Sequence, residues 1–105
     1  MTKVKLLYSE ELLVGFKVSG HATSSADDEQ GRLVCSAISS AAFMTANTIT
    51  EIVGASAEIK QDDGLLSLKV TSNFEEALPI LSGFALHIKE LSNQFEKYVT
   101  IITEV

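Results

Sequence analysis

Two residues of this chain carry side chains suited to nucleophilic catalysis, and they stand fourteen positions apart. Cys35 is the only cysteine among the 105 residues, and His21 is one of two histidines. A cysteine nucleophile needs a nearby base, and an imidazole serves by taking the thiol proton and later protonating the leaving amine. The pair therefore predicts a site in which two different elements bring the imidazole and the thiol together.

The elements around this pair are predicted to be the end of a strand and the beginning of a helix. Residues 20–32 are polar, small and aperiodic, which is typical of a loop, and a loop of this length is often functional. Helical spacing of apolar residues runs over 33–53, and Gly54 follows as a C-cap. Cys35 is thus expected in the first helical turn, where the macrodipole favours a thiolate. The N–H groups of Cys35 and Ser36 would be free there to bind an oxyanion.

Each of the two residues also has a structural interpretation. A lone cysteine between apolar residues such as Val34 and Ile38 is typical of a small buried side chain. A histidine at a strand end is often a hydrogen-bond partner of the backbone. On residue types alone, the catalytic and the structural interpretations both stay open.

The remaining chain predicts the scaffold. Period-2 alternation indicates strands, and Ser9-Glu10-Glu11 and Asp62-Asp63-Gly64 are typical hairpin turns. A second helix is expected over 74–95, capped by Ser72 or Asn73. The expected strands are 3–8, 12–19, 56–61, 65–70 and 99–103. The order ββαββαβ predicts an α+β fold, a single two-layer domain over 1–105 with two helices packed on a mostly antiparallel sheet.

Composition limits the setting and the partners. One cysteine allows no internal disulfide, and Met1-Thr2-Lys3-Val4 has no signal-peptide pattern, so a reducing, cytoplasmic location is expected. No apolar run is expected to reach the roughly 18–20 residues of a membrane helix. The net charge of −6 argues against direct nucleic-acid binding and is compatible with a cationic partner or simply with solubility.

No metal or cofactor is predicted. His21 with Asp27, Asp28 and Glu29 lacks a second well-spaced histidine or cysteine. Asp62-Asp63-Gly64 lacks the rest of a calcium-loop pattern, and no phosphate-binding glycine motif occurs. His87, inside the second predicted helix, is expected at the surface or at the boundary of the core.

Two motifs surround the candidate pair: Gly20-His21-Ala22 and Val34-Cys35-Ser36-Ala37-Ile38-Ser39. They resemble the motifs of the ribosomal-processing cysteine protease (Prp) family, and the resemblance extends over the whole chain in length and element order. It implies that Cys35 is the nucleophile and His21 the general base. It implies a homodimer that removes the N-terminal extension of large-subunit ribosomal protein twenty-seven, in support of ribosome assembly. Ser36, Gly20 and Ala22 are the candidates for substrate or oxyanion binding.

Two departures from that family pattern stand between the motifs. Arg32 occupies a place where the family usually has an acidic residue, and the loop between histidine and cysteine is slightly longer. If an acidic residue orients the imidazole, Asp27 or Asp28 is the candidate here. The alternative is that both are solvated loop charges.

Other functions also fit the same residues. A non-catalytic ribosome-associated module of the same fold would bind the peptide without cutting it. A thiol sensor or another cysteine-dependent hydrolase would need Cys35 without that substrate. Cleavage of the peptide, and its dependence on Cys35 and His21, separates these possibilities.

Overall fold

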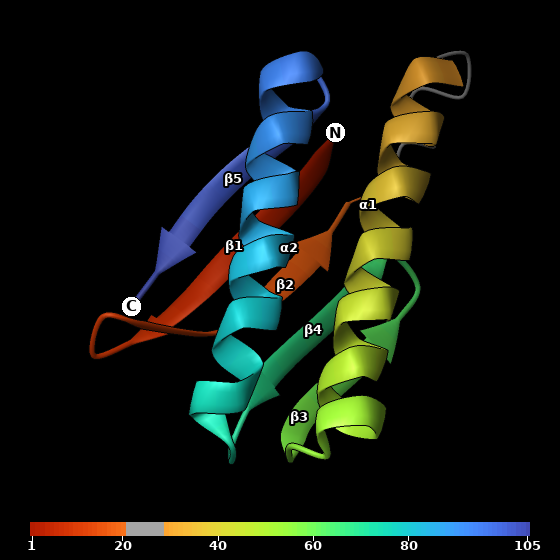
Figure 1. Cartoon of the computed structure of the whole chain (residues 1–105). Helices are drawn as coiled ribbons and strands as arrows, with labels where there is room; N and C mark the ends of the chain where they lie inside the picture. The colour runs from red at the N-terminus through yellow and green to blue at the C-terminus, as the bar shows by residue number, and fades with distance from the viewer. Residues whose placement is uncertain (21–28) are drawn as a thin grey trace.

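Five strands build one mixed sheet, shown in the computed structural model of Figure 1. The structure describes residues 1–20 and 29–105. The sheet order is β3-β4-β2-β1-β5, with every pairing antiparallel except the parallel pair β1–β5. The strands are β1 (Thr2–Ser9), β2 (Leu12–Ser19), β3 (Ala57–Asp62), β4 (Leu65–Val70) and β5 (Val99–Glu104).

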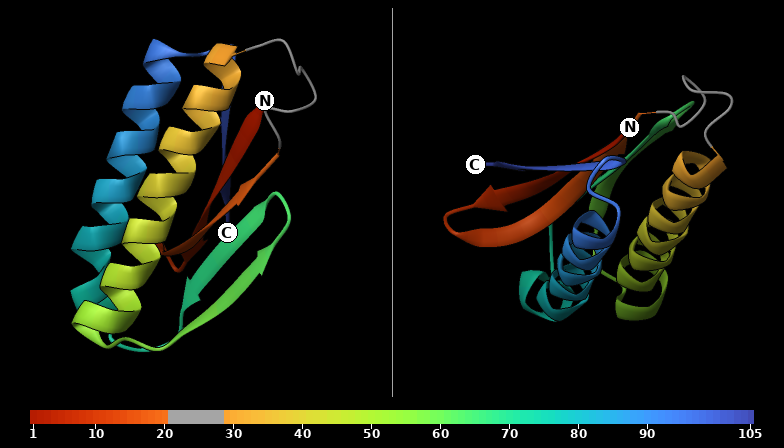
Figure 2. Two further views of the ribbon diagram at one scale, coloured as in Figure 1. Left: turned by 90° about the vertical axis from the view of Figure 1, so that its right-hand side faces the viewer. Right: turned by 90° about the horizontal axis from the view of Figure 1, so that it is seen from above.

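Two helices cover one face of this sheet and leave the other face open (Figure 2). They are α1 (Glu29–Asn47), which continues as the π-helix η2 (Thr48–Val53), and α2 (Phe74–Gln94). The predicted ββαββαβ order and two-layer α+β architecture are confirmed. The sheet is mostly antiparallel, as expected.

The core lies between the sheet and the two helices. Phe16 of β2 and Phe84 of α2 meet at its centre, with ring centroids 4.5 Å apart and planes tilted by 34°. Ile38 and Ile49 bring the apolar stripe of the first helix into the same cluster and are fully buried. Full burial of each such side chain contributes about 1.5–3 kcal/mol before entropy is counted.

Both predicted hairpin turns are present. Glu10 and Glu11 close the first hairpin with φ of 50° and 68°, and Gly64 closes the second with φ of 73°. Gly54 ends the helical run in the left-handed region, as its C-cap position predicts, and its N–H donates to the Ile49 carbonyl. Asn73 precedes α2, but its side chain makes no capping hydrogen bond.

The predicted start of the first helix is wrong. Residues 29–32, expected in the loop, form the first turn of α1. Glu29 in that turn suits the positive end of the helix dipole. A single glycine costs a helix only about 1 kcal/mol, and Gly31 lies buried inside α1 without ending it.

The continuous helical run Glu29–Val53 concerns the expectation that no segment of the chain is long and apolar enough to span a membrane. By length and composition it is apolar enough to span a bilayer, contrary to the expectation that no segment is. One third of its most apolar window is buried in this fold. Val34, Ile38 and Ala42 on that run belong to the core cluster beneath α1, and core helices of soluble proteins satisfy the same criteria.

We expect Gly15→Ala to destabilise the sheet strongly. Gly15 pairs with Lys69, and a Cβ there would meet the Leu68 carbonyl oxygen and lie 2.9 Å from Lys69 Cα. Both are backbone atoms of a paired strand, so the overpacking should lower the free energy of unfolding by about 1–3 kcal/mol. Denaturant titration measures the change.

Gly83→Ala is the matched control for this prediction. Among the described residues, no heavy atom outside its own helix backbone lies within 4 Å of a Cβ built at Gly83. The change should stabilise α2 by up to about 1 kcal/mol, because alanine is the better helix former. A Gly15→Ala protein as stable as the parent would contradict the close approach of β2 and β4.

Candidate active site

The strand that leads into the predicted catalytic loop is held firmly at its end. Ser19, the last residue of β2, pairs with Lys3 on one side and Leu65 on the other. The N–H of Gly20 then donates to the Gly64 carbonyl at 3.2 Å. This bond joins the end of β2 to the β3–β4 turn. The residue before His21 therefore has a fixed position on the sheet.

Gly20 itself adopts a backbone conformation that other residues avoid. Its φ is 107°, and a Cβ there would meet the Met1 carbonyl oxygen. Its N–H is taken by Gly64, so Gly20 is not a free oxyanion donor in this conformation.

Cys35 is the seventh residue of α1 and is partly buried as a free thiol. The expectation that it lies in the first helical turn is therefore wrong. In an α-helix the N–H groups beyond the first four donate to carbonyls four residues earlier. The N–H groups of Cys35 and Ser36 belong to the seventh and eighth residues of α1, so they are not free to bind an oxyanion. The side chain of Ser36 remains exposed beside the thiol.

The thiol lies on the flank of α1 that faces away from α2. A cavity of about 300 Å³ between the two helices marks the opposite flank, and Leu33 and Ala37 line it. Successive helical residues are turned by about 100°, so Cys35 lies about 160° around the helix from each of them. In Figure 1, α1 lies on the β3–β4 side of α2, which places Cys35 on the outer flank toward that hairpin.

This arrangement brings three features to one corner of the molecule. The outer flank of α1, the β3–β4 turn at Gly64 and the end of β2 at Gly20 lie on the same side of the fold (Figure 2). The segment between Gly20 and Glu29 connects two of them.

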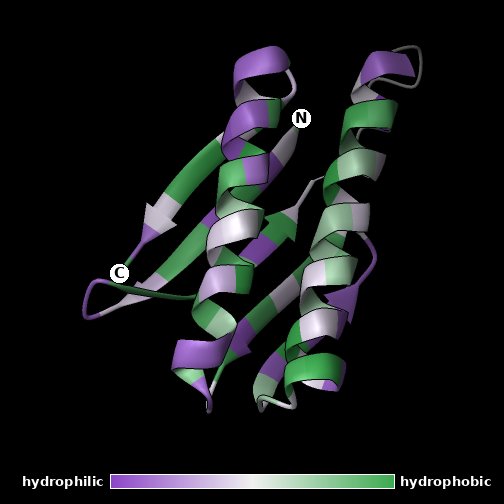
Figure 3. Ribbon diagram, in the orientation of Figure 1, coloured by the Kyte–Doolittle hydropathy of each residue, from purple (hydrophilic) through white to green (hydrophobic). Residues whose placement is uncertain are grey.

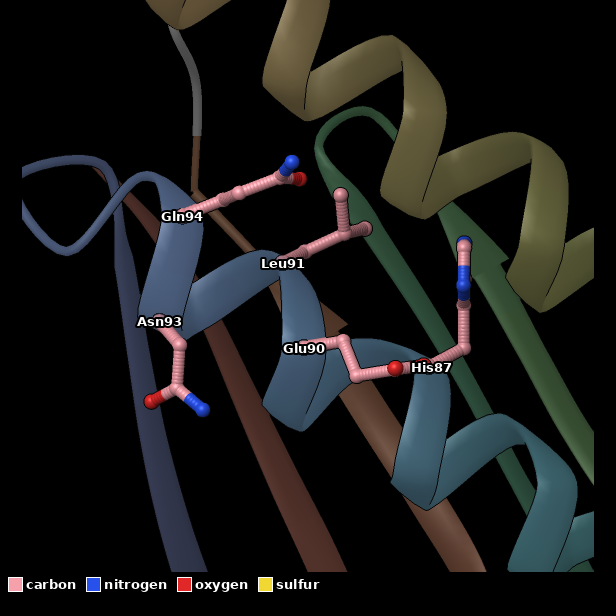
Figure 4. Close-up of a pocket in the computed structure, with 5 residues that line it drawn as sticks. All are labelled: His87, Glu90, Leu91, Asn93 and Gln94. Carbon is pink, nitrogen blue, oxygen red and sulfur yellow. The ribbon is translucent and has the colours of Figure 1, made fainter.

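His87 lies elsewhere. It lines a shallow pocket of about 510 Å³ on α2, where Figure 4 shows His87 and Leu91 pointing toward α1 and Asn93 pointing away. It also borders a groove with Thr45 and Thr48 of the first helical run. Ala41, which lines the same groove, stands about 9 Å along the helix axis from Cys35, at about 1.5 Å per residue, and lies on the flank of α1 beside α2. His87 is thus on the wrong flank of α1 to serve as the base for Cys35.

Several predicted site residues lie outside the described residues: His21, Ala22, Asp27 and Asp28. Arg32, which replaces an expected acidic residue, is exposed on the first turns of α1. Within residues 1–20 and 29–105, no group of three or more histidine, cysteine or acidic side chains has a geometry for a metal ion. The hydrogen bond between Gly20 and Gly64 was not predicted from the sequence. The signal for it was the position of the two glycines, each next to the end of a strand.

We expect Gly20→Ala to slow alkylation of Cys35 by iodoacetamide at least about tenfold near neutral pH. The new Cβ would strain the backbone and displace the chain leading to His21, and displacements near 1 Å cost catalytic groups large factors. Mass spectrometry of the alkylated protein over time gives the rate.

Gly54→Ala is the control for this effect. Its φ of 79° imposes similar backbone strain, but at the far end of the first helical run. It should lower stability and leave the alkylation rate unchanged at temperatures where both proteins are folded. Equal rates for all three proteins would show that Gly20 does not position the base.

Comparison with known structures gives matches over nearly the whole chain. A protein from Streptococcus mutans aligns with a TM-score of 0.82 at 20% identity, covering 99% of this chain and 96% of the other. The essential ribosomal processing protease Prp from Staphylococcus aureus, in complex with a substrate peptide, aligns with a TM-score of 0.86 at 19% identity, covering 99% and 100%. The same protease with a covalently linked product peptide aligns with a TM-score of 0.82 at 20% sequence identity, covering 99% of this chain and 100% of the other.

These structural matches establish the fold. No curated protein sequence matches the chain significantly. The family model described as cysteine protease Prp matches residues 1–100, which is almost the entire sequence. This chain belongs to the Prp family of cysteine proteases.

Proposed function

We propose that this protein is a cytoplasmic endopeptidase that removes the N-terminal extension of large-subunit ribosomal protein twenty-seven. Family membership supports peptide-bond hydrolysis by a cysteine, and Cys35 is the only cysteine of the chain. The S. aureus relative, a ribosomal processing protease, has been crystallised with substrate and product peptides. The same reaction class in this chain would support ribosome assembly by exposing a mature N-terminus.

The position of Cys35 is the main support for assigning the nucleophile and its base. Its half-buried thiol lies on the outer flank of α1, at the corner where the chain leaves Gly20. His87 is excluded as a partner because it borders the groove on the opposite flank of α1. His21, the residue after Gly20, is the remaining histidine and is our proposed general base.

The proposed reaction is acyl transfer through a thioester. His21 accepts the thiol proton as Cys35 Sγ attacks the scissile carbonyl carbon, and a tetrahedral oxyanion forms. Collapse breaks the C–N bond, and the imidazolium gives its proton to the leaving amine. Water, activated by His21, then attacks the thioester and releases the new carboxyl terminus with the thiol restored.

The donors for the oxyanion differ from those expected. Since the N–H groups of Cys35, Ser36 and Gly20 are engaged or lie inside the helix, we propose that the exposed Ser36 hydroxyl contributes one donor. Ala22 follows the proposed base in sequence, and its N–H is the second candidate. Asp27 or Asp28 would orient the imidazole of His21, or else remain solvated.

We expect Cys35→Ala to abolish cleavage of a peptide that carries the extension and to leave its binding measurable. His21→Ala should reduce kcat by at least about a hundredfold, the usual contribution of general acid–base catalysis. The measurement is mass spectrometry of the products, with binding followed by fluorescence anisotropy.

His87→Ala is the matched histidine control and should cleave at the parental rate. A parent protein that binds the peptide stably without producing a shorter product would instead identify a non-catalytic binding module. Alkylation of Cys35 at a rate indifferent to His21 would argue for a thiol with another role.

We also propose that the protein is a homodimer in solution, formed through the groove between α1 and α2. Two cavities of about 300 and 380 Å³ follow this groove, and their walls are mainly apolar. Leu33 and Met44 on α1 border them and are 66% and 69% exposed. Figure 3 shows apolar residues and residues of intermediate hydropathy along α1. A second copy would cover these side chains and leave the Cys35 flank accessible.

We expect Met44→Glu to raise the dimer dissociation constant by at least about thirtyfold, because a carboxylate would be desolvated in an apolar contact. Sedimentation velocity over a concentration series checks this. Leu86→Glu is the control: Leu86 is 60% exposed, but it borders a different cavity, beside Tyr8 and Leu12. Parental association by both variants would exclude this groove as the dimer interface.

A further inference from the structure

The sheet face turned away from both helices, here called the open face, carries a concentration of lysines. Side chains alternate along strands, so the burial of Val4, Phe16 and Leu68 under the helices sends their neighbours to the open face. Among the described residues, this face holds five of the eight basic residues of the chain. They are Lys3, Lys5, Lys17, Lys60 and Lys69, and we call them the lysine array.

The strand register arranges the array across four neighbouring strands. Lys17 of β2 lies opposite Lys5 of β1 on one side and opposite Ser67 of β4 on the other. Ser67 in turn lies opposite Lys60 of β3. With strands about 4.7–4.9 Å apart, this central row spans roughly 14 Å.

Two more lysines extend the row diagonally. Lys69 lies opposite Gly15, two residues before Lys17 along β2, and Lys3 lies opposite Ser19, two residues after it. Lys3 and Lys69 therefore lie on opposite sides of the central row. The array is a two-dimensional set of ammonium groups.

The positive charge of the lysine array exceeds the negative charge of the carboxylates on the same face. Three carboxylates share the open face among the described residues: Glu58, Asp62 and Glu104. Lys5 contacts Glu104 at 3.2 Å, and this is the one ion pair that the described residues form on this face. Lysines outnumber carboxylates there, although the chain as a whole has a net charge of −6.

The pairing of Lys5 with Lys17 adds a direct cost. Like charges at directly opposite positions of an antiparallel pair destabilise it. Both side chains are also half-buried, which reduces the screening of their repulsion by water. A polyanion over the open face would relieve this repulsion, which is the electrostatic complementarity expected of a binding surface.

We propose that the open face binds the phosphate backbone of RNA, with Lys17 at the centre of the contact. The backbone groups of β4, β2 and β1 are paired on both sides, so a peptide cannot add to this face as a strand. Recognition must come from side chains. The regularly repeated phosphate charges of a nucleic-acid backbone can meet several lysines at once.

The shape of the face favours RNA over the other polyanions. Its described residues form a strand surface without a projecting helix, and such a surface suits the wide, shallow minor groove of A-form RNA. A bilayer would need several protruding apolar side chains, whereas Leu7 and Leu65 on this face are half-buried and Ile102 is 37% exposed. The acidic net charge did not anticipate this surface, because an average over the chain hides where the lysines lie.

The test measures binding of a fluorescein-labelled RNA hairpin by anisotropy over a series of salt concentrations. If about four lysines contact phosphates, the slope of log K against log salt should be about −3 to −4. Lys17→Gln/Lys69→Gln should weaken binding at least about tenfold and make the slope smaller in magnitude by about 2. Lys89→Gln/Lys97→Gln has the same charge change away from the open face and should bind like the parent.

Peptide cleavage and thermal unfolding of the same variants separate this proposal from the proposed function. Neither lysine pair touches the Cys35 corner, so cleavage should continue at the parental rate whether or not RNA binds. If the first pair of changes impairs folding, Lys60→Gln/Lys69→Gln provides the same comparison on β3 and β4.

Three results would overturn the proposal. One is an absence of RNA binding by the parent at low salt, and another is equal weakening by the array and control variants. The third is binding of a DNA duplex of the same sequence, phosphatidylserine vesicles or polyglutamate as tightly as the RNA hairpin. Each of these would assign the lysine array to another partner or to none.

Discussion

The register of β2 between β1 and β4 is the constraint on which the rest of the structure depends. The strand is paired on both sides, and a slip by one residue would exchange every side chain between the two faces of the sheet. The observed register sends Phe16 into the core against Phe84, and it sends Lys17 to the open face. It also ends the strand at Ser19, so that Gly20 meets Gly64 and the next residue starts from a fixed point.

Gly15 is what permits that register. The absence of a Cβ lets the backbone of β4 approach β2 closely at this position. The close approach holds the β3–β4 hairpin beside the end of β2, and α1 runs over the same side of the sheet (Figure 1). Packing in the sheet therefore fixes the position of Gly20, the residue before the proposed base.

The helix α1 presents a different surface on each of its sides. One side belongs to the core, one flank borders the apolar groove beside α2, and the opposite flank carries Cys35. A dimer through the groove would leave the thiol accessible to a peptide. RNA bound to the open face would contact neither the groove nor the thiol, because the sheet lies between the open face and α1.

Much of the fold was predictable from the sequence because its signals are local. Alternation identified four strands, the β-branched run 99–103 identified the fifth, Asp63-Gly64 identified a turn, and Gly54 identified a helix end. The start of α1 was not predictable by the same means. Gly31 and Arg32 have no apolar periodicity, and the burial of Gly31 depends on tertiary packing.

The candidate site was predictable only in its residue types. Cys35 and its motif pointed to a cysteine nucleophile, and the Prp family match agrees with that inference. The flank of α1 that carries the thiol follows from where α2 packs, which no local pattern encodes. The lysine array likewise requires the register of four strands, since its members are spread from Lys3 to Lys69 in sequence.

The central claim is that His21 meets Cys35, and the two histidines of the chain allow a direct test. Proton NMR at a fixed, near-neutral pH would follow the imidazole signals before and after blocking Cys35 with methyl methanethiosulfonate. The account predicts that the His21 signals shift and that the His87 signals, from the far flank of α1, stay in place. Unchanged His21 signals, or a shift of the His87 signals alone, would contradict it.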